Sequence, residues 1–245
     1  MGFYHKVKRA LACFFIRDTR TVDLSEAVIS FCFDDVPNSA LLEGRAILKK
    51  YGFAGTYYIS LGLSELEKPG NGHFDAALLK SVVEEGGELG CHTYDHIHFY
   101  TSNKKQIADT LDRNQKSIDN LISGYTFKNF SYPYGEQTFF SKKLIRSRFS
   151  SGRSVISGIN TNPVDLNNLK ATQLDSTLKP EAVFALIDQA IARKAWLILY
   201  THDVTENCSE WGCTPEYFEQ VVKYCANKKV KTLTIEKTLI NASRK

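Results

Sequence analysis

The sequence predicts a single-domain α/β protein built as a β/α barrel of about seven parallel strands. Apolar, β-rich runs alternate with amphipathic helical patterns along nearly the whole chain, which is typical of βα units around a parallel sheet. The length of 245 residues suits one such barrel. Histidines and acidic residues follow several of the runs, at the strand ends where barrels carry their reactive groups.

The expected strands are short runs rich in β-branched and aromatic residues. They lie at 27–35, 54–61, 87–93, 127–135, 151–158, 195–203 and 229–236. With helical patterns between them, these strands favour a closed or nearly closed barrel over a sandwich.

Five helices are expected between the strands. The first begins after Asn38 or Ser39, which are good N-caps, and ends at Gly52. The others lie at 74–87, 101–124, 179–195 and 214–229. The last two each begin with a proline at the first helical position, where the N–H that proline lacks would have no partner within the helix. Each helix carries one apolar stripe that can cover the sheet.

The charge balance excludes one class of partner. The formal net charge is +4, and no block of Lys and Arg is interleaved with stacking aromatic residues. We therefore expect no nucleic-acid binding.

The first 26 residues form a distinct segment, basic and aromatic in character. Its apolar run "LACFFI" is shorter than the roughly 7–15 residues of a signal-peptide core or the roughly 20 of a membrane span. We expect residues 1–26 to pack on the barrel formed by 27–245, and the protein to be cytoplasmic. A weak contact of this segment with an anionic membrane surface is the alternative.

Candidate catalytic residues follow three of the expected strands. Asp34 and Asp35 end the first strand, the end of the third carries His92 and His96, and the strand 195–203 ends in His202 and Asp203. Because the carboxyl ends of parallel strands meet on one face, these side chains should converge. Two histidines and one carboxylate are a common catalytic set for zinc or iron, with positions left open for water and substrate.

The stretches "FCFDDVPNSA", "GCHTYDH", "FSYPYGE" and "LILYTHD", in this order and spacing, resemble the motifs of the polysaccharide deacetylase family. The resemblance covers roughly residues 28–236 and implies a distorted β/α barrel. It also implies a hydrolase that uses a divalent metal, most often Zn²⁺, to remove N-acetyl groups from amino sugars of a glycan or a cell-surface polysaccharide precursor. Residues 27–245 would then be the catalytic barrel.

The resemblance also implies roles for individual residues. Asp35, His92 and His96 would bind the metal, and Asp34 would be the general base. The main-chain N–H of Tyr134 would hold the oxyanion, and His202 would protonate the leaving group.

Two positions of the resemblance are irregular. The family arginine that pairs with the base aspartate corresponds to Ser131, and we expect Arg153 on the next strand to replace it. The acid that orients His202 is poorly marked; Asp165 is the expected residue, with Asp175 as the alternative.

Other functions remain open at this stage. The same site could cleave an O-acetyl ester or another linear amide or formamide, or the chain could be a non-catalytic, glycan-binding relative without the family arginine. Trp211, in the polar loop after His202, would either stack on a sugar ring or anchor the loop.

Overall fold

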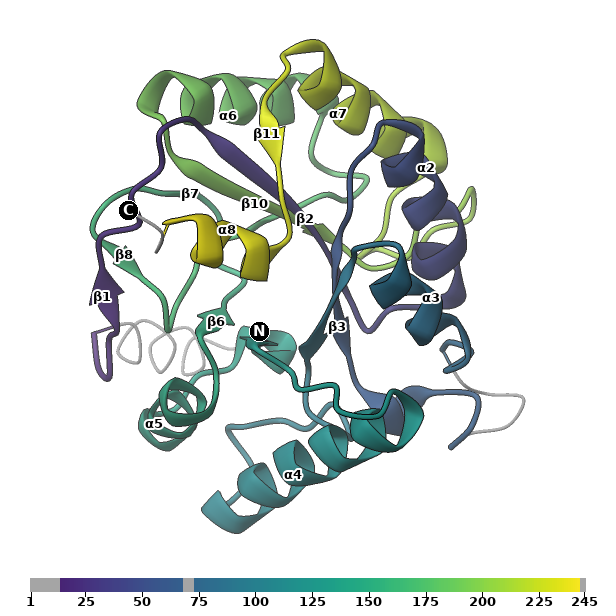
Figure 1. Ribbon diagram of the computed structural model, residues 1–245, viewed down its shortest axis with the longest axis vertical. Helices are drawn as coiled ribbons and strands as arrows, with labels where there is room; N and C mark the ends of the chain where they lie inside the picture. Colours follow the sequence, from purple (N-terminus) through teal and green to yellow (C-terminus); the bar gives the residue numbers. More distant parts are fainter. Residues whose placement is uncertain (1–13, 68–72, 243–245) are drawn as a thin grey trace.

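A computed structural model describes residues 14–67 and 73–242 of the chain, and every structural statement below refers to these residues. Nine of the described strands form one curled sheet, and β1 (Thr19–Arg20) and β8 (Val164–Asp165) form a separate antiparallel pair. Helices surround the sheet on its outer face (Figure 1). The described segments therefore form the distorted barrel that the sequence predicted.

All seven expected strands are present and pair in parallel, although most are shorter than expected. They are β2 (Val28–Asp34), β3 (Thr56–Ile59), β4 (Glu88–Cys91), β5 (Asn129–Ser131), β6 (Ser151–Arg153), β10 (Trp196–Thr201) and β11 (Lys231–Thr232). Their order across the sheet is β6-β5-β4-β3-β2-β10, and β11 pairs with β2 off this path. The first half of β2 pairs with β11 and its second half with β3, which opens the sheet at its amino end.

The barrel is distorted because two of its strands do not touch. The path is open between β6 and β10, and the chain over 166–173 bridges it. The amide of Leu169 donates to Gly152 of β6 at 2.9 Å, and β9 (Thr172–Gln173) then pairs with β10 in parallel. The strand β7 (Ile159–Asn160) also pairs with β10, but antiparallel, so the sheet is mixed rather than wholly parallel.

The five expected helices are present with shorter bounds. A π-helical turn (Ala40–Gly44) leads into α2 (Arg45–Lys50), followed by α3 (Leu78–Glu84), α4 (Lys104–Leu121), α6 (Pro180–Arg193) and α7 (Pro215–Asn227). Local sequence explains two starts: Asn103 forms a capping box with Gln106 at α4, and Pro215 opens α7 behind the Thr214 cap.

Two helices were not predicted. One is α5 (Phe139–Arg148), and the other is α8 (Ile235–Ala242), which begins where the expected strand 229–236 was to end. That strand stops at Thr232. The amides of Ile235 and Glu236 find acceptors in the Thr56 hydroxyl (3.0 Å) and the Glu88 carboxylate (2.9 Å). This tertiary capping starts the helix there.

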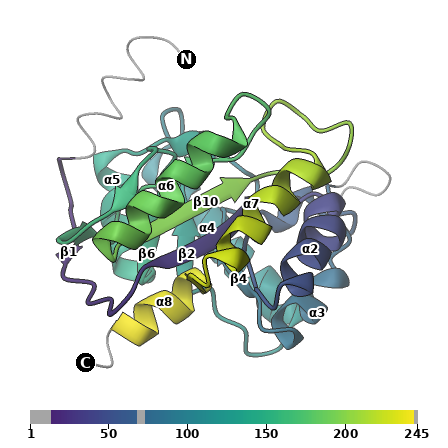
Figure 2. The ribbon, with the colours of Figure 1, turned by 90° about the horizontal axis from the view of Figure 1, so that it is seen from above.

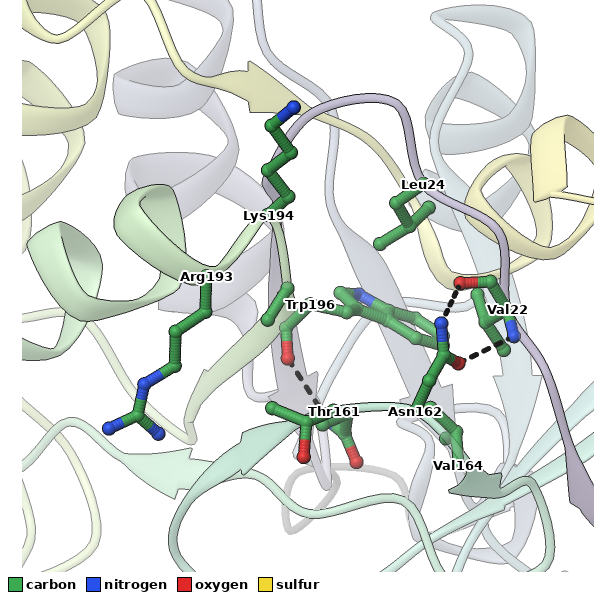
Figure 3. Close-up of a pocket in the computed structure, with 10 residues that line it drawn as sticks. Val22, Leu24, Thr161, Asn162, Val164, Arg193, Lys194 and Trp196 are labelled. Carbon is green, nitrogen blue, oxygen red and sulfur yellow. Dashed lines mark hydrogen bonds between the residues drawn. The ribbon is translucent and has the colours of Figure 1, made fainter.

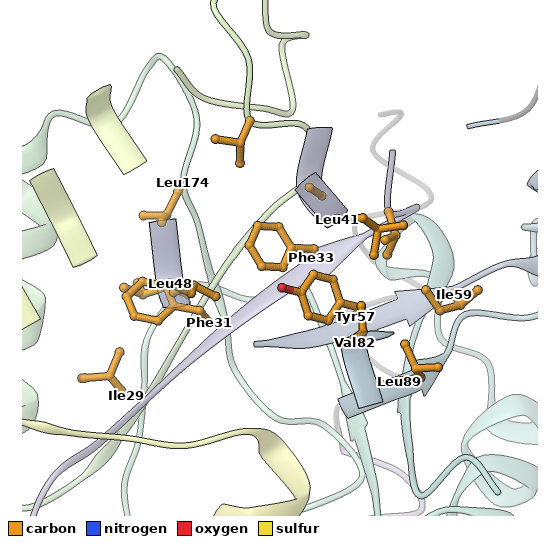
Figure 4. Close-up of a cluster of buried hydrophobic side chains, with 14 of the residues drawn as sticks. Ile29, Phe31, Phe33, Leu41, Leu48, Tyr57, Ile59, Val82, Leu89 and Leu174 are labelled. Atoms are coloured by element: carbon orange, nitrogen blue, oxygen red, sulfur yellow. The ribbon is translucent and has the colours of Figure 1, made fainter. Parts of the chain in front are cut away.

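The strand β2 separates two apolar clusters, because its side chains alternate between the faces of the sheet. Ile29, Phe31 and Phe33 pack outward against the helices (Figure 4). Val28 and Cys32 belong to the second cluster, with Trp196 of β10. Asp34 continues the inward series of Val28 and Cys32, so its carboxylate faces the barrel interior.

The amino end of the barrel carries a small cavity of about 120 Å³ beside Trp196, the first residue of β10 (Figure 3). Asn162 lines it and bonds to both main-chain groups of Val22, at 2.7 and 2.9 Å. Val22 and Leu24 of the N-terminal segment also line this cavity, and it holds none of the expected catalytic residues.

None of the helices in residues 14–67 and 73–242 is long and apolar enough to cross a membrane.

Figure 2 shows α6 and α7 side by side over β10 and β2. Long loops follow the carboxyl ends of β4 and β10, at the face where such barrels carry their sites.

Candidate metal centre and active site

The register of the sheet brings the candidate residues together. Asp34 is the last residue of β2, and Thr201 of β10 pairs with Phe33, so His202 follows beside Asp34. His92 directly follows β4, two strands away from β2. Residues far apart in the sequence therefore meet at one edge.

The chain turns sharply after Asp34. Asp35 and Val36 both have left-handed backbone angles, with φ of 55° and 48°, and the amide of Val36 donates back to the Asp34 carbonyl at 2.5 Å. Adjacent side chains on a regular strand point to opposite faces. The turn lets Asp35 approach the same site as Asp34. It leaves Val36, a β-branched residue, in a strained backbone conformation.

Asp35, His92 and His96 form a cluster of three metal-type ligands whose donor atoms all lie within 4.8 Å of one another. The Oδ1 atom of Asp35 is 3.6 Å from Nε2 of His92 and 3.2 Å from Nε2 of His96. Nδ1 of His92 lies 2.8 Å from the Ser131 carbonyl, which can only accept, so this nitrogen carries the hydrogen. Nε2 of His92 is then free to offer its lone pair to a metal.

The properties of these three side chains fit a divalent ion. Burial lowers the pKa of His92 and of His96 to about 4, so both rings are neutral at pH 7, as ligands must be. Oδ1 of Asp35 is buried without a hydrogen bond from any described residue. Two imidazoles and a carboxylate suit zinc but also other divalent metals.

Arg153 pairs with Asp34. Its Nη2 donates to Oδ2 of Asp34 and to the hydroxyl of Ser131, and the arginine is fully buried. Its guanidinium lies over the rings of Tyr58 (5.1 Å) and Tyr200 (4.4 Å). These contacts hold the cation in the barrel interior.

The pairing favours the ionised form of the Asp34 carboxylate. Burial raises the pKa of Asp34, but Arg153, together with His92 and His202, outweighs that effect and holds the pKa below its ordinary value. Ser131 and Arg153 are register partners on β5 and β6. The cation beside Asp34 is thus Arg153 of β6, on the strand next to Ser131, the position that corresponds to the family arginine.

Tyr134 sits in a tight turn, Pro133–Gly135, with φ of 56° and ψ of 9°. The phenol ring meets the ring of His96 edge-on at a centroid distance of 4.4 Å. Gly135 also has positive φ, and a Cβ there would lie 2.2 Å from a methyl of Val155. The turn therefore requires glycine at 135 and fixes the main chain of Tyr134 near the candidate metal ligands.

His202 is oriented by a carbonyl group. Its Nδ1 lies 3.2 Å from the main-chain oxygen of Trp211. The loop carrying Trp211 is pinned by Asp203, whose carboxylate accepts from the amide (2.7 Å) and the hydroxyl (2.6 Å) of Ser209. The Trp211 indole is exposed, with its ring 6.3 Å from that of His202.

The expectation that Asp165 orients His202 is wrong. The Asp165 carboxylate accepts from the amide of Asp18 at 2.9 Å and lies 3.8 Å from Nζ of Lys142. It anchors the N-terminal segment instead. The alternative, Asp175, accepts from the amide and the hydroxyl of Thr177 in its own turn. Neither acid bonds to His202 in the described parts of the chain.

Glu136 and His98 were not among the expected site residues, and His98 was expected only at the surface or in a lid. Nδ1 of His98 lies 3.0 Å from Oε1 of Glu136, and the His98 ring stacks on the ring of Tyr134 at 3.8 Å, with an interplanar angle of 9°. The signals were present in "DHIHFY" and "PYGE", but nothing local shows that these two stretches meet.

Comparison with known proteins agrees with this geometry. The model of the polysaccharide deacetylase family matches residues 21–148, which include both acids, both metal-type histidines and the Tyr134 turn. The peptidoglycan-N-acetylglucosamine deacetylase PgdA of Listeria monocytogenes is 29% identical over 108 residues, 44% of this chain. The chain spans about a fifth (21%) of the length of that relative.

Solved structures show the same fold. The Xyl-CE4 domain of a multidomain xylanase from the hindgut metagenome of Trinervitermes trinervoides superposes with a TM-score of 0.61 at 18% identity, covering 89% of this chain and 92% of that one. The peptidoglycan deacetylase PdaC from Bacillus subtilis gives 0.59 at 20% identity, covering 91% and 94%. From the family match over more than half its length, this chain belongs to the polysaccharide deacetylase family.

Proposed function

We propose that this protein is a metal-dependent hydrolase that removes N-acetyl groups from amino sugars of a glycan or a polysaccharide precursor. The observation that carries the proposal is the placement of a buried Asp34–Arg153 pair beside the Asp35–His92–His96 cluster. Membership of the family supports the same reaction.

Asp35, His92 and His96 would hold the divalent ion, for which we propose Zn²⁺. When bound, such an ion supplies a more acidic water and an electrophilic contact for the acetyl carbonyl. The neutral state of both rings and the unsatisfied Asp35 oxygen support this ligand set.

Asp34 would accept the proton of the attacking water. Arg153 keeps the carboxylate ionised and fixes its Oδ2, while Oδ1 receives no hydrogen bond from the described residues. The free oxygen can therefore take the proton. A carboxylate with a lowered pKa is a weak base, which is sufficient only for a water that is already acidified.

The main-chain N–H of Tyr134 would donate to the oxyanion as the acetyl carbon becomes tetrahedral. The positive φ of Tyr134 and the rigid turn around it support this role, because a donor fixed before the reaction needs no reorganisation during it.

His202 would give a proton to the leaving nitrogen. Its Nδ1–H is held by the Trp211 carbonyl, so the proton gained on protonation resides on Nε2, which is the atom available to the substrate. This arrangement needs no orienting carboxylate and replaces the role that the sequence gave to Asp165.

The test is release of acetate from N-acetylated glycan oligomers, with and without added Zn²⁺. Wild type should release acetate, and Asp34→Asn and His202→Ala should each reduce kcat by at least about a hundredfold, as expected for lost acid or base catalysis. The same substrate carrying O-acetyl groups tests the ester alternative. If wild type releases no acetate from either substrate, and both variants still bind glycan as wild type does, the protein is a non-catalytic glycan-binding relative.

That binding-only reading has less support than the sequence suggested. It relied on the missing arginine at Ser131, and Arg153 occupies the position beside Asp34. The contact of Arg153 with Asp34 supports the catalytic proposal.

For the N-terminal segment we propose packing on the barrel, with a weak membrane contact as the alternative. Residues 1–13 lie outside the described residues, but the Asp18 carbonyl accepts from Leu166 at 2.8 Å, which supports the packing. Phe14, Phe15 and Phe139 are exposed, with the rings of Phe15 and Phe139 in edge contact. Sedimentation with anionic and zwitterionic vesicles tests the contact; binding to neither excludes it.

A further inference from the structure

Two loops at the carboxyl end of the barrel are tied together by a buried carboxylate. Glu136, in the loop after β5, is 7% exposed. Its Oε1 lies 3.0 Å from Nδ1 of His98, and its Oε2 accepts from the amide of Tyr100 at 3.0 Å. Both partners belong to the loop between β4 and α4, which also carries His96.

The same tie reaches Tyr134 through the His98 ring. Because a carboxylate only accepts, Nδ1 of His98 carries the hydrogen and the plane of its ring is fixed. That ring lies flat on Tyr134, with centroids 3.8 Å apart and planes at 9°. Tyr134 also contacts the ring of His96, edge-on at 4.4 Å. Its ring is thus in contact with two imidazole rings.

Tyr134 needs such support because its backbone is strained. A left-handed φ of 56° is unfavourable for a residue other than glycine. The amides of Gly135 and Glu136 are committed to the carbonyls of Tyr132 (2.9 Å) and Pro133 (3.0 Å), which completes the turn. A small relaxation of this turn would move the Tyr134 N–H away from the acetyl oxygen.

We infer that Glu136 and His98 act as a positioning pair, which holds the Tyr134 turn and the His96 ring in place for the reaction. The inference rests on the proposed deacetylase function for its kinetic consequence, but not for its structural one. His98 is half-exposed at the rim of the site, and neither residue is assigned contact with the reacting atoms.

Kinetics provide the first test. His98→Ala should lower kcat about tenfold with KM nearly unchanged, since a misplaced donor weakens the transition state more than ground-state binding. His98→Phe keeps a ring over Tyr134 but loses the bond to Glu136, so its loss should be smaller. Glu136→Gln keeps an acceptor and should retain activity to within about threefold, whereas Glu136→Ala should resemble His98→Ala.

A matched control separates positioning from stability. Phe184 of α6 stacks on Tyr224 of α7 at 4.1 Å and 9°, almost the same geometry on the outer helices. Phe184→Ala should lower the melting temperature without lowering kcat. Equal kcat losses in the two alanine variants would overturn the inference.

Amide hydrogen exchange provides a test independent of activity. In His98→Ala, the peptide over 133–138 and the amide of Tyr100 should exchange at least about tenfold faster than in wild type, as in a locally opened segment. Unchanged exchange overturns the inference whether or not the protein is an enzyme. If wild type releases no acetate, the proposed function fails, and faster exchange together with weaker Zn²⁺ binding by His98→Ala would still support the positioning pair.

Discussion

Asp34 and Glu88 lie equally deep in the molecule, each 3% exposed, at opposite ends of the same sheet. Asp34 ends β2 and Glu88 begins β4. Their pKa values move in opposite directions: that of Asp34 is below its ordinary value, and that of Glu88 is raised to about 7. The opposite pKa shifts of Asp34 and Glu88 therefore do not come from a difference in burial.

The partners of the two carboxylates explain the difference. Glu88 accepts hydrogen bonds from Asn129 (2.6 Å), Thr56 (3.0 Å) and the amide of Glu236 (2.9 Å), but no described residue forms an ion pair with it. Burial raises the pKa of Glu88, and the hydrogen bonds from these neutral donors offset only part of that rise. Asp34 has a permanent cation in Arg153. A buried anion is maintained by a matched charge more effectively than by neutral hydrogen bonds.

Backbone strain also separates the two ends. Of the eight described residues other than glycine with positive φ, five lie in the turns of the candidate site: Asp35, Val36, Thr93, His96 and Tyr134. The amino end has only two of the eight, Lys194 before β10 and Lys229 before β11, and it starts α8 with hydrogen-bonded caps. Strain of this kind persists where the surrounding contacts over-determine the chain, which is typical of functional sites.

The largest predicted effect comes from removing the cation. Arg153→Met should destabilise the protein by about 3–5 kcal/mol, because it leaves Asp34 buried and unpaired. The pKa of Asp34 should rise, so the acidic limb of the pH–rate profile moves to higher pH. Urea unfolding and acetate release measure the two effects.

The control for that variant is Arg148→Met, which removes a partly exposed arginine paired with Asp112. A surface pair of this kind contributes about 1 kcal/mol or less. Retention of full activity by Arg153→Met, with an unmoved acidic limb, would contradict the role of the Asp34–Arg153 pair.

The next largest effect is expected from a second arginine. Ser131→Arg places a cation where Nη2 of Arg153 already bonds, and an extra buried charge should cost on the order of 3 kcal/mol and reduce activity. Combining it with Arg153→Ser should recover part of both losses. A gain of activity in the single variant would show that the site lacks a cation.

Glu88→Gln should change how stability depends on pH. The folded-state pKa of Glu88 is about 7 and its ordinary value is 4.5, so the folded state binds more protons than the unfolded state between these values. Stability should fall as pH rises from 4.5 to 7, by about 3 kcal/mol from this group. The variant should lack this slope, apart from a pH-independent cost for one mismatched donor.

Urea unfolding at pH 4.5, 6 and 8 measures the slope in wild type and variant. Glu85→Gln is the matched control, since Glu85 is partly exposed and paired with Lys49. Identical slopes in wild type and Glu88→Gln would show that Glu88 is ionised throughout, and that the two ends do not differ as described.

The smallest effect is expected from Thr56→Val. The hydroxyl of Thr56 donates to Glu88 and accepts from the amide of Ile235. Its loss should cost about 1–2 kcal/mol, as for a lost helix cap, and raise the pKa of Glu88 further. Acetate release should be unaffected, because Thr56 lies at the amino end; a tenfold loss would mean that the two ends are coupled.

The sequence by itself determined the alternation of strands and helices and the identity of most candidate residues. Periodicity of 2 and 3.6 is set by local backbone geometry, so the seven parallel strands and five of the helices could be predicted. The break after "FCFDD" likewise showed that Asp34 and Asp35 could serve one site. These are local properties of the chain.

The tertiary structure alone decided the hydrogen-bond partners of several of these groups. The contact of Arg153 with Asp34, which the sequence had suggested, depends on the register of β5 and β6. The fold also gave His202 a carbonyl partner from Trp211 and used Asp165 to anchor the N-terminal segment. It also started α8 at Ile235 with caps from Thr56 and Glu88. Such pairings depend on strand register and loop closure, which leave no periodic signal in the sequence.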